Sequence, residues 1–315
     1  MKIVVLDRKS LGMDTPLDGL NKFGDVVIYD STSSDELNSR ISDADVIVLN
    51  KVRITESAFE AAKSLKLICI FATGFDNVDL VSARKHGVGV CNVPGYSTDS
   101  VALFTLASVL SLYTHLREYN DYVITGEYTK NGVPNCLTPV YHEISGKTWG
   151  IIGLGNIGRA VAKVAEALGA RVIANKRTPV SDYECVDIDT LCRESDIITI
   201  HCPLNDESRG LINKDRIALM KRDVVIVNEA RGAVVDEYDI ADAIKKGTIG
   251  AFGSDVYSTE PFGVDHPFYE IKGKYNVLFT PHAAWGSYES RKRCINVICA
   301  NVEAYLNGER KNRVD

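Results

Sequence analysis

The first hundred residues alternate between short apolar runs and stretches with the periodicity of an amphipathic helix. Apolar runs with the length and branched content of buried strands occur at KIVVLD, DVVIYD, DVIVLN, LKLICIF and GVGVCNVP. Helical patterns, such as SDELNSRISDA and TESAFEAAKSL, separate them. This rhythm predicts a parallel sheet with helices on both of its faces.

A long apolar helix is predicted to follow this region. It begins near Ser97, with Thr98 or Asp99 as its N-cap, and its apolar face continues without interruption to Asn120. Residues 121–145 are then rich in Tyr, Gly and Pro, and they are too many for a simple connection. Because long apolar helices between domains often pair with a second copy, we expect a homodimer that forms through helix 98–119 and the arm of residues 121–145.

The alternation of strand and helix begins again after the arm. Further strands are predicted at TWGIIG, ARVIAN, DIITIHC, DVVIVNEA, IGAFGSDV and NVLFTPHA, and a last amphipathic helix at SRKRCINVICANVEAYLNGE. We expect this helix to pack back on the first region. The prediction is an α/β protein of two domains, in which residues 1–98 and 287–315 form one discontinuous domain around an inserted domain of residues 99–286.

Composition and charge narrow the class of protein. The 315 residues are 45% hydrophobic and 25% charged, as in ordinary globular proteins, and the net charge of −6 argues against nucleic acid or an anionic membrane as a partner. We find no signal peptide and no apolar run of about 18 residues, so we expect a cytoplasmic protein. The eight cysteines form no C-x-x-C pair and are predicted to be core residues rather than disulfides or metal ligands.

A glycine pattern follows the first strand of the second region. Gly153, Gly155 and Gly158 form G-x-G-x-x-G between a strand and a helix, with a further strand after the helix. In this context the first glycine permits a tight turn, the second lets the backbone approach a pyrophosphate, and the third lets helix and strand pack closely. The pattern predicts a dinucleotide-binding Rossmann-like domain at residues 99–286 and leaves residues 1–98 and 287–315 as the substrate domain, which is Rossmann-like or flavodoxin-like.

The next strand ends on cations where a dinucleotide domain usually has a carboxylate. Lys176 lies 18 residues after Gly158, and Arg177 and Thr178 follow it. A carboxylate here would accept hydrogen bonds from the ribose hydroxyls, whereas two cations and a hydroxyl suit a 2′-phosphate. NADP(H) is therefore favoured and NAD(H) is possible. The alternative is a solvated loop that tolerates either cofactor.

Three further strand ends carry groups suited to acid–base chemistry. Arg231 follows the strand in VIVNEARG, Asp255 and Glu260 lie in GSDVYSTEPF, and His282 lies in LFTPHAAWGS. His201, in IHCPL, also ends a strand and is interpreted as part of the cofactor lining. None of the other histidines has a setting comparable with that of His282; they are His86, His115, His142 and His266.

Together these motifs resemble those of the D-2-hydroxyacid dehydrogenase family, and most closely its glycerate dehydrogenase and hydroxypyruvate reductase branch. The resemblance extends over nearly the whole chain, through ATGFDNVDL, NVPGYSTDSVA, GKTWGIIGLGNIG, HCPL, MKRDVVIVNEARGAVVDE, SDVYSTEP and TPHAAWGS. It implies a nicotinamide cofactor in a cleft between two Rossmann-like domains, and a homodimer built on the cofactor domains. It also implies that Arg231 binds the substrate, that His282 is the acid/base, and that Glu260 pairs with it.

These roles fit the reduction of a 2-oxo acid. His282 would supply the proton to the carbonyl oxygen, Glu260 would favour the charged imidazolium and orient the ring, and Arg231 would hold the substrate carboxylate. The predicted substrate-binding residues are Lys51, Thr73, Gly74, Arg231, His282 and Trp285, with Asn50, Arg53 and Tyr96 near the side-chain pocket. The predicted cofactor-binding residues are Gly153, Gly155, Asn156, Ile157, Gly158, Lys176, Arg177, Thr178, His201, Cys202, Pro203, Ala230, Asp255 and Ala284.

Alternative interpretations remain open at this point. Arg231 could form a salt bridge with Asp236 or Glu237, and Glu260 could be an ordinary surface charge. A dinucleotide-sensing corepressor of the same fold would keep the same motifs, whereas a formate dehydrogenase-like enzyme would typically have glutamine at position 260. The chain departs from the family pattern at Glu229, where a small or hydroxylated residue is common, and at Leu103 and Phe104.

Overall fold

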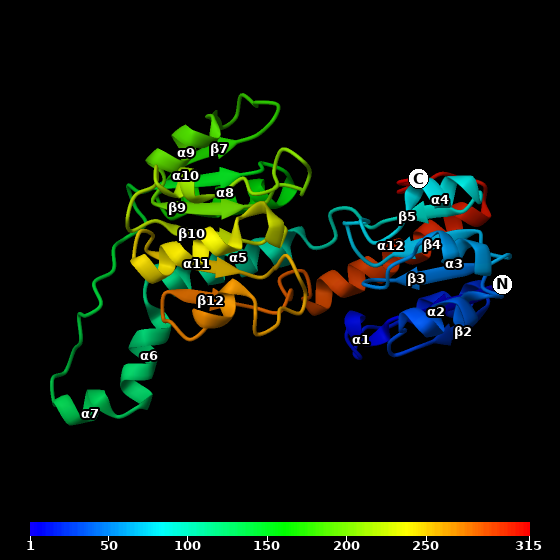
Figure 1. Cartoon of the computed structure of the whole chain (residues 1–315), viewed down its shortest axis with the longest axis horizontal. Coiled ribbons are helices and arrows are strands. Elements are labelled where there is room, and N and C mark those ends of the chain that lie inside the picture. The colour runs from blue at the N-terminus through cyan, green and yellow to red at the C-terminus, as the bar shows by residue number, and fades with distance from the viewer. The chain divides into compact units, whose positions relative to one another are not determined.

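The computed structural model describes residues 1–315 as two compact units (Figure 1). The first unit consists of Met1–Ser97 with Gly286–Asp315, and the second unit is Thr98–Trp285. Each unit has one sheet in which all strand pairs are parallel, with helices packed against it. The α/β class expected from the alternation of strand and helix is confirmed.

The sheet of the first unit has the strand order β2-β1-β3-β4-β5. Its strands are β1 (Lys2–Val5), β2 (Asp25–Ile28), β3 (Val46–Leu49), β4 (Leu67–Ile70) and β5 (Gly89–Cys91). Every residue of β3 and β4 is buried, whereas β2 at the edge is partly exposed. Continuous burial along the inner strands is typical of a parallel sheet that is covered on both faces.

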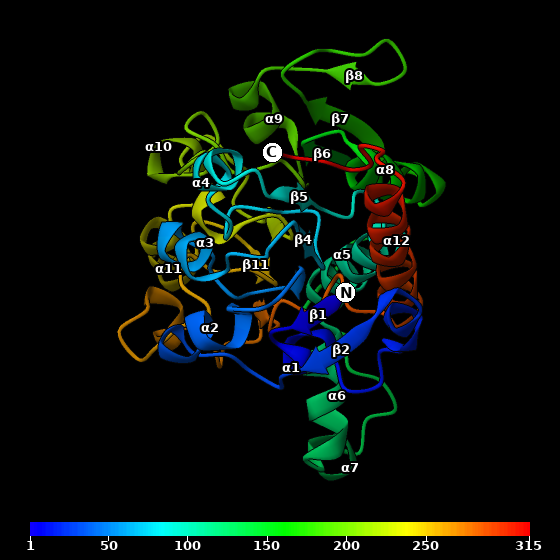
Figure 2. The ribbon, with the colours of Figure 1, turned by 90° about the vertical axis from the view of Figure 1, so that its right-hand side faces the viewer.

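The helices of the first unit divide between the two faces of this sheet, with α2, α3 and α4 on one face and α12 on the other (Figure 2). They are α1 (Arg8–Leu11), the 3-10 helix η1 (Asp18–Phe23), α2 (Ser34–Ile41), α3 (Glu56–Ala61), α4 (Leu80–Lys85) and α12 (Tyr288–Leu306). The C-terminal helix α12 begins at its N-cap Ser287, whose hydroxyl accepts from the Ser290 N–H, and packs against β4 and η1.

The sheet of the second unit has the order β12-β11-β10-β9-β6-β7-β8. Its strands are β6 (Thr148–Ile152), β7 (Arg171–Asn175), β8 (Glu184–Cys185), β9 (Ile197–Ile200), β10 (Val225–Asn228), β11 (Ala251–Ser254) and β12 (Val277–Phe279). The two-residue strand β8 is the one strand that the apolar pattern did not predict. Because β6 pairs with β7 on one side and β9 on the other, the strand order reverses there, and ligands of open α/β sheets bind at such a point.

Two apolar clusters cover the faces of the second sheet. One lies beneath α5 (Thr98–Tyr113) and α8 (Asn156–Ala167), around Trp149. The other lies beneath the helices of the opposite face and contains Phe252 and Phe268, whose ring centroids are 5.3 Å apart. The elements of that face are α9 (Ile188–Glu194), α10 (Lys214–Ile217), α11 (Glu237–Lys246), and the 3-10 helices η2 (Gly232–Val234) and η3 (Pro267–Glu270).

The expectation of one long helix from residue 98 is wrong. The chain forms α5 and then α6 (Leu116–Ile124), which are bent by 63° relative to each other, and His115 between them has a left-handed backbone with φ 53°. The hydroxyl of Thr114 donates to the carbonyl of Leu110 at 2.7 Å, an interaction that often bends helices. The apolar pattern continues past the bend. It does not mark a single helix, because α6 belongs to a projecting arm rather than to the core.

This arm consists of α6, α7 (Glu127–Asn131) and the irregular residues 132–143 (Figure 1). Neither helix has a buried residue. The arm is attached where the guanidinium of Arg117 donates to the carbonyl of Val277 at 2.7 Å. No helix of the chain is by itself long and apolar enough to cross a membrane, although the bent pair α5 and α6 meets the criterion when the two are taken together.

We expect Phe268→Ala to destabilise the second unit by about 3–5 kcal/mol, because the ring is fully buried among other aromatic rings and its removal leaves a cavity. The neighbouring exposed Tyr269→Ala is the matched control and should change the free energy of unfolding little. Thermal melting of both variants checks this prediction. Equal melting temperatures would contradict the packing described for this face.

Candidate active site

The glycine loop after β6 has the shape that a dinucleotide requires. Gly153 has a φ of +94°, and a Cβ there would lie 2.5 Å from the backbone nitrogen of Cys202. A Cβ on Gly158 would lie 2.3 Å from the carbonyl oxygen of Gly153. Gly155, by contrast, is the N-cap of α8, has no side-chain cap, and faces open space within 4 Å of its would-be Cβ. Asn156 and the next residues therefore present uncapped N–H groups to a space that a side chain would fill.

The cations after β7 lie next to this loop. The ammonium of Lys176 donates to the carbonyl of Leu154, in the glycine loop, at 3.5 Å. Arg177 and Thr178 follow and are exposed. The nearby Arg159 on α8 pairs with Asp182. Lys176 therefore lies at the rim of the glycine loop, and Arg177 is its neighbour in the chain. In a domain of this type the adenosine ribose lies at the end of the strand that follows the glycine loop.

His201, at the end of β9, is half-buried beside the same loop. Both of its ring nitrogens are shielded from solvent and have no hydrogen-bond partner. Burial lowers the pKa of His201 to about 3, so the ring is neutral. Unpaired buried polar atoms are unfavourable, and a ligand group in the crevice between β6 and β9 would satisfy them. Together with the open space at Gly155, this arrangement fits a bound dinucleotide.

The structure brings His282 and Glu260 together although they follow different strands. His282 Nδ1 lies 2.6 Å from Glu260 Oε2, and Glu260 Oε1 accepts from the Tyr257 N–H at 3.1 Å. An ionised carboxylate only accepts, so Nδ1 carries the proton and the tautomer of the ring is fixed. The two side chains are 25% and 29% exposed, which leaves them accessible to a substrate. His282 also has a φ of 54°, a strained conformation that is concentrated at functional sites.

Asp255, at the end of β11, anchors the segment that carries His282. Its Oδ1 accepts from the Thr280 hydroxyl at 2.7 Å and from the Ala283 N–H at 2.8 Å, and its Oδ2 accepts from the Ala284 N–H at 2.8 Å. The phenol of Tyr257 donates to the carbonyl of Thr280 at 2.8 Å, and burial raises the pKa of this phenol, which stays a neutral donor. The ends of β11 and β12 are thereby fixed to each other.

Arg231 follows β10, and Asn228 holds its backbone by donating from the side-chain amide to the Arg231 carbonyl at 2.9 Å. The two carboxylates considered as structural partners for Arg231 are engaged elsewhere. Asp236 accepts from two N–H groups at the start of α11, and Glu237 accepts from Ser258 and His266. Ala230, the other predicted residue here, is buried, and its carbonyl accepts from Arg231 Nη1 at 2.9 Å.

Gly232 brings the Arg231 segment against the turn that carries Glu260. A Cβ on Gly232 would lie 2.0 Å from the carbonyl carbon of Tyr257 and 2.2 Å from the backbone nitrogen of Ser258. No side chain fits in this contact. The strand ends of β10 and β11 therefore meet through backbone packing, close to two of the three predicted catalytic residues.

The predicted substrate residues of the first unit follow adjacent strands. Lys51 comes after β3, and its N–H donates to the buried carboxylate of Asp7 at 2.6 Å. Thr73 and Gly74 come after β4, and the Thr73 hydroxyl donates to the carbonyl of Val93 at 2.9 Å. These residues thus lie at the carboxyl edge of the first sheet. Trp285 is the last residue of the second unit and is half-buried.

Two further carboxylate–imidazole pairs have no counterpart among the sequence motifs. His266 Nε2 lies 2.9 Å from Glu237, and His86 Nε2 lies 3.0 Å from Glu56. The expectation that no other histidine has a comparable setting is therefore wrong. The partners are 29 and 30 residues apart, and no short motif links them, so the sequence held no local signal for either pair.

Glu229, where the chain departs from the family pattern, is buried. Its Oε1 accepts from the Ser108 hydroxyl on α5 at 3.4 Å, and its Oε2 has no partner. Burial, and secondarily the negative charge of Asp255, raise the pKa of Glu229 well above its ordinary value. We therefore expect a neutral carboxylic acid at this position.

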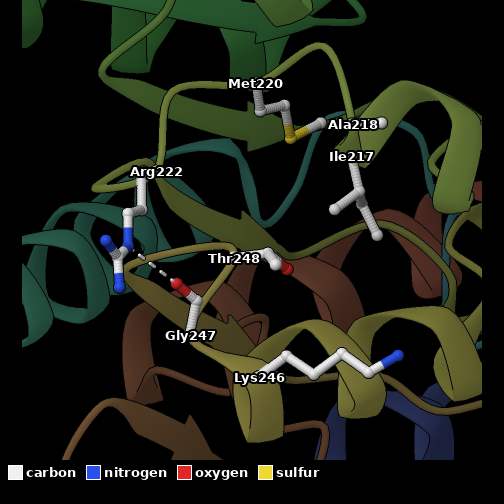
Figure 3. A pocket seen from close by; sticks show the side chains of 7 residues that line it. All are labelled: Ile217, Ala218, Met220, Arg222, Lys246, Gly247 and Thr248. Atoms are coloured by element: carbon white, nitrogen blue, oxygen red, sulfur yellow. Dashed lines mark hydrogen bonds between the residues drawn. The ribbon is translucent and has the colours of Figure 1, made fainter.

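A cavity of about 330 Å³ lies at the surface of the second unit (Figure 3). Arg222 Nε donates to the carbonyl of Gly247 across its edge. The cavity shares no residue with the predicted site. It is lined by Ile217, Ala218, Met220, Arg222, Lys246, Gly247 and Thr248.

Comparison with known proteins gives the site its context. Residues 106–284 match the family model of the D-isomer specific 2-hydroxyacid dehydrogenase NAD binding domain. The chain is 39% identical to the hydroxypyruvate reductase of Blautia hydrogenotrophica, over the whole of both chains, and 34% identical to the glycerate dehydrogenase of Methylorubrum extorquens, over 100% of this chain and 99% of the relative. A solved acyclic imino acid reductase in complex with NADPH and D-Arg covers both chains completely, with a TM-score of 0.88 and 30% identity.

The matched region contains the glycine loop and all three predicted catalytic residues, and the similarity to the first relative extends over the entire chain. The resemblance inferred from the motifs is confirmed. The chain belongs to the D-isomer specific 2-hydroxyacid dehydrogenase family, and it is an oxidoreductase with a domain that binds a nicotinamide dinucleotide.

Proposed function

We propose that the protein reduces a small 2-oxo acid of the hydroxypyruvate or glyoxylate type to the D-2-hydroxy acid, with His282 as the acid/base. The observation that carries this proposal is the 2.6 Å contact between His282 Nδ1 and Glu260 Oε2, which fixes the orientation and the tautomer of the ring. The names of the similar proteins, hydroxypyruvate reductase and glycerate dehydrogenase, support the substrate class.

The protein's own groups would divide the work as follows. His282 Nε2 donates a proton to the carbonyl oxygen during reduction and removes it in the reverse reaction. Glu260 holds the ring through Nδ1 and stabilises the imidazolium. Arg231 binds the substrate carboxylate with two parallel hydrogen bonds and polarises the carbonyl. Further substrate contacts are assigned to Lys51, Thr73, Gly74 and Trp285.

The second unit is the proposed cofactor domain, and the first unit the proposed substrate domain. The uncapped start of α8 and the open space at Gly155 support a pyrophosphate position there. The unpartnered nitrogens of His201 support a contact with the cofactor, beside Cys202 and Pro203. When it is bound, the nicotinamide dinucleotide supplies the hydride that reaches the carbonyl carbon. Asp255 and Ala284 would then lie near the nicotinamide end.

Substitution of His282 by Ala should lower kcat for 2-oxo acid reduction by roughly 10²–10⁴, the usual contribution of a positioned acid/base. Steady-state rates with a panel of 2-oxo acids, each measured with NADH and NADPH, provide the assay. His86→Ala is the matched control, since it removes a histidine from another His–Glu pair. Near wild-type reduction by the His282 variant would refute the mechanism.

A wild-type protein that binds the dinucleotide but turns over no 2-oxo acid would favour the alternative of a dinucleotide-sensing regulator. Binding is measured by fluorescence of the reduced cofactor, independently of turnover. The two outcomes therefore separate an enzyme from a binding protein of the same fold.

We propose that NADP(H) is preferred over NAD(H), because Lys176, Arg177 and Thr178 offer two cations and a hydroxyl at the ribose position. A charge-assisted contact contributes roughly 1.5–3 kcal/mol, and exposure moves the value to the low end, so we expect about tenfold in kcat/KM. Lys176→Asp should reverse the preference, and added salt should weaken it. Lys163→Asp, the same change of charge at an exposed position on α8, should leave the ratio unchanged. A tenfold wild-type preference for NADH would contradict this assignment.

We also propose a homodimer that forms through α5 and the arm. The arm leaves several large apolar side chains exposed, among them Ile124, Leu137 and Val140. Sedimentation at micromolar concentration should give twice the mass of the chain, and Ile124→Lys should shift the equilibrium toward the monomer. Val81→Lys is the control, because Val81 is 72% exposed, close to the 70% of Ile124, but lies in the first unit. A monomeric wild type would refute the dimer.

A further inference from the structure

The turn that carries Glu260 forms hydrogen bonds with a second carboxylate–imidazole pair. Glu237 is the first residue of α11, and His266 is the N-cap of η3. His266 Nε2 lies 2.9 Å from Glu237 Oε2, and each side chain is only 7% exposed. This pair is therefore much less accessible than the pair formed by His282 and Glu260.

One protonation arrangement satisfies this second pair. The Phe268 N–H donates to His266 Nδ1 at 3.2 Å, so Nδ1 has no proton and Nε2 donates its proton to Glu237. The imidazole also stacks on Phe262 at a centroid distance of 4.8 Å. His266 is thus a neutral ring with a fixed tautomer and a fixed orientation, and its N–H is directed at one oxygen of Glu237.

Glu237 uses its remaining acceptor capacity on one residue of the turn. Its Oε1 accepts from the Ser258 N–H at 2.8 Å, and its Oε2 accepts from the Ser258 hydroxyl as well as from His266. Ser258 lies between Tyr257, whose N–H donates to Glu260 Oε1, and Glu260 itself. A continuous path of hydrogen bonds and two peptide units therefore leads from His266 through Glu237 to Glu260 and on to His282.

The backbone of the turn is also in close contact with the segment that carries Gly232. The backbone of Tyr257 and Ser258 is packed against Gly232, where a Cβ would lie 2.0 Å from the Tyr257 carbonyl carbon. Glu237 follows Gly232 by five residues in the same segment of chain, so this segment contacts the turn at two points. The position of the turn is therefore fixed by the backbone contact with Gly232 and by the hydrogen bonds to Glu237.

We propose that Glu237 is a positioning residue for the reduction: held by His266, it fixes the Tyr257–Glu260 turn and thereby the carboxylate that orients His282. The proposal rests on the function proposed for His282 and Glu260, since Glu237 acts only through them. A purely structural role would need no ions here. The neighbouring face of the sheet is covered by an apolar cluster that includes Phe252 and Phe268, and apolar side chains would stabilise the turn without the unfavourable burial of a carboxylate.

The substitution Glu237→Gln tests the proposal, because it preserves shape and removes one acceptor. Its amide NH₂ would face a donor in either orientation, the Ser258 N–H or the His266 N–H, and a change of the His266 tautomer would set Nδ1–H against the Phe268 N–H. We expect kcat to fall roughly 10- to 100-fold, in line with the sensitivity of catalysis to misplacement of a group by about 1 Å. The KM for the 2-oxo acid, which depends on Arg231, should change little.

A double-mutant cycle with Glu260→Gln shows whether Glu237 acts through Glu260. If it does, Glu237→Gln should have almost no further effect on kcat in the Glu260→Gln background, because the group that it positions is already changed. Losses that multiply would overturn the proposal. Failure of the proposed function has a different signature, since Glu260→Gln and His282→Ala would then themselves keep wild-type turnover.

Asp236→Ala is the matched control for helix stability. Asp236 precedes Glu237 and caps α11 by accepting from the Tyr238 and Asp239 N–H groups, without contact to the turn. We expect this variant to lower the melting temperature and leave kcat unchanged. If Asp236→Ala and Glu237→Gln reduced kcat in equal measure, the role of Glu237 would be structural only, and the proposal would be wrong.

Two further measurements keep the test decisive if Glu237→Gln folds poorly. Ser258→Ala removes only the hydroxyl donor and should give a smaller loss of kcat that again disappears in the Glu260→Gln background. Nitrogen-15 spectra of the imidazole of His266 should show a neutral Nε2–H ring in the wild type and a changed ring signal in Glu237→Gln. An unchanged kcat in Ser258→Ala, together with an unchanged His266 spectrum in Glu237→Gln, would overturn the proposal.

Discussion

The hydrogen bond between His282 and Glu260 depends on one property of the fold, the convergence of parallel strand ends at a single edge. β10, β11 and β12 are adjacent in the second sheet, and Arg231, Glu260 and His282 follow them in that order. Parallel pairing places all three carboxyl ends on the same edge. Residues that are up to 51 positions apart in the chain can therefore form one constellation, and the distance of 2.6 Å follows from how the connecting turns are held.

Carboxylates hold those turns, and they differ in how deeply they are buried. Asp255 is fully buried and accepts three hydrogen bonds from the segment that carries His282. Glu237 is buried and accepts two hydrogen bonds from Ser258 in the turn that carries Glu260 and a third from His266. Only Glu260 and His282 keep about a quarter of their surface exposed. The acceptors of the buried groups are used within the protein, whereas the pair of His282 and Glu260 stays partly accessible to solvent.

At the glycine loop after β6, close backbone packing rather than buried carboxylates fixes the turn. Gly153 and Gly158 let β6, β9 and α8 approach so closely that no Cβ fits, and this contact leaves the space in front of Gly155 open. Both ring nitrogens of His201 are shielded from solvent at the same point and are unpaired. A tightly packed turn beside an unsatisfied polar group is the arrangement expected where a ligand completes the structure.

The sequence by itself determined the features that depend on local pattern. Apolar runs defined eleven of the twelve strands, the spacing of Gly153, Gly155 and Gly158 defined the turn, and the motifs around Arg231, Glu260 and His282 identified the family, because each of these signals lies within about ten residues. Tertiary structure alone decided the bend at His115, since the apolar pattern of α6 is the same whether the helix lies in a core or in an arm. It also decided the pairing of Glu237 with His266 and of Glu229 with Ser108, because partners 29 and 121 residues apart leave no periodic trace in a single chain.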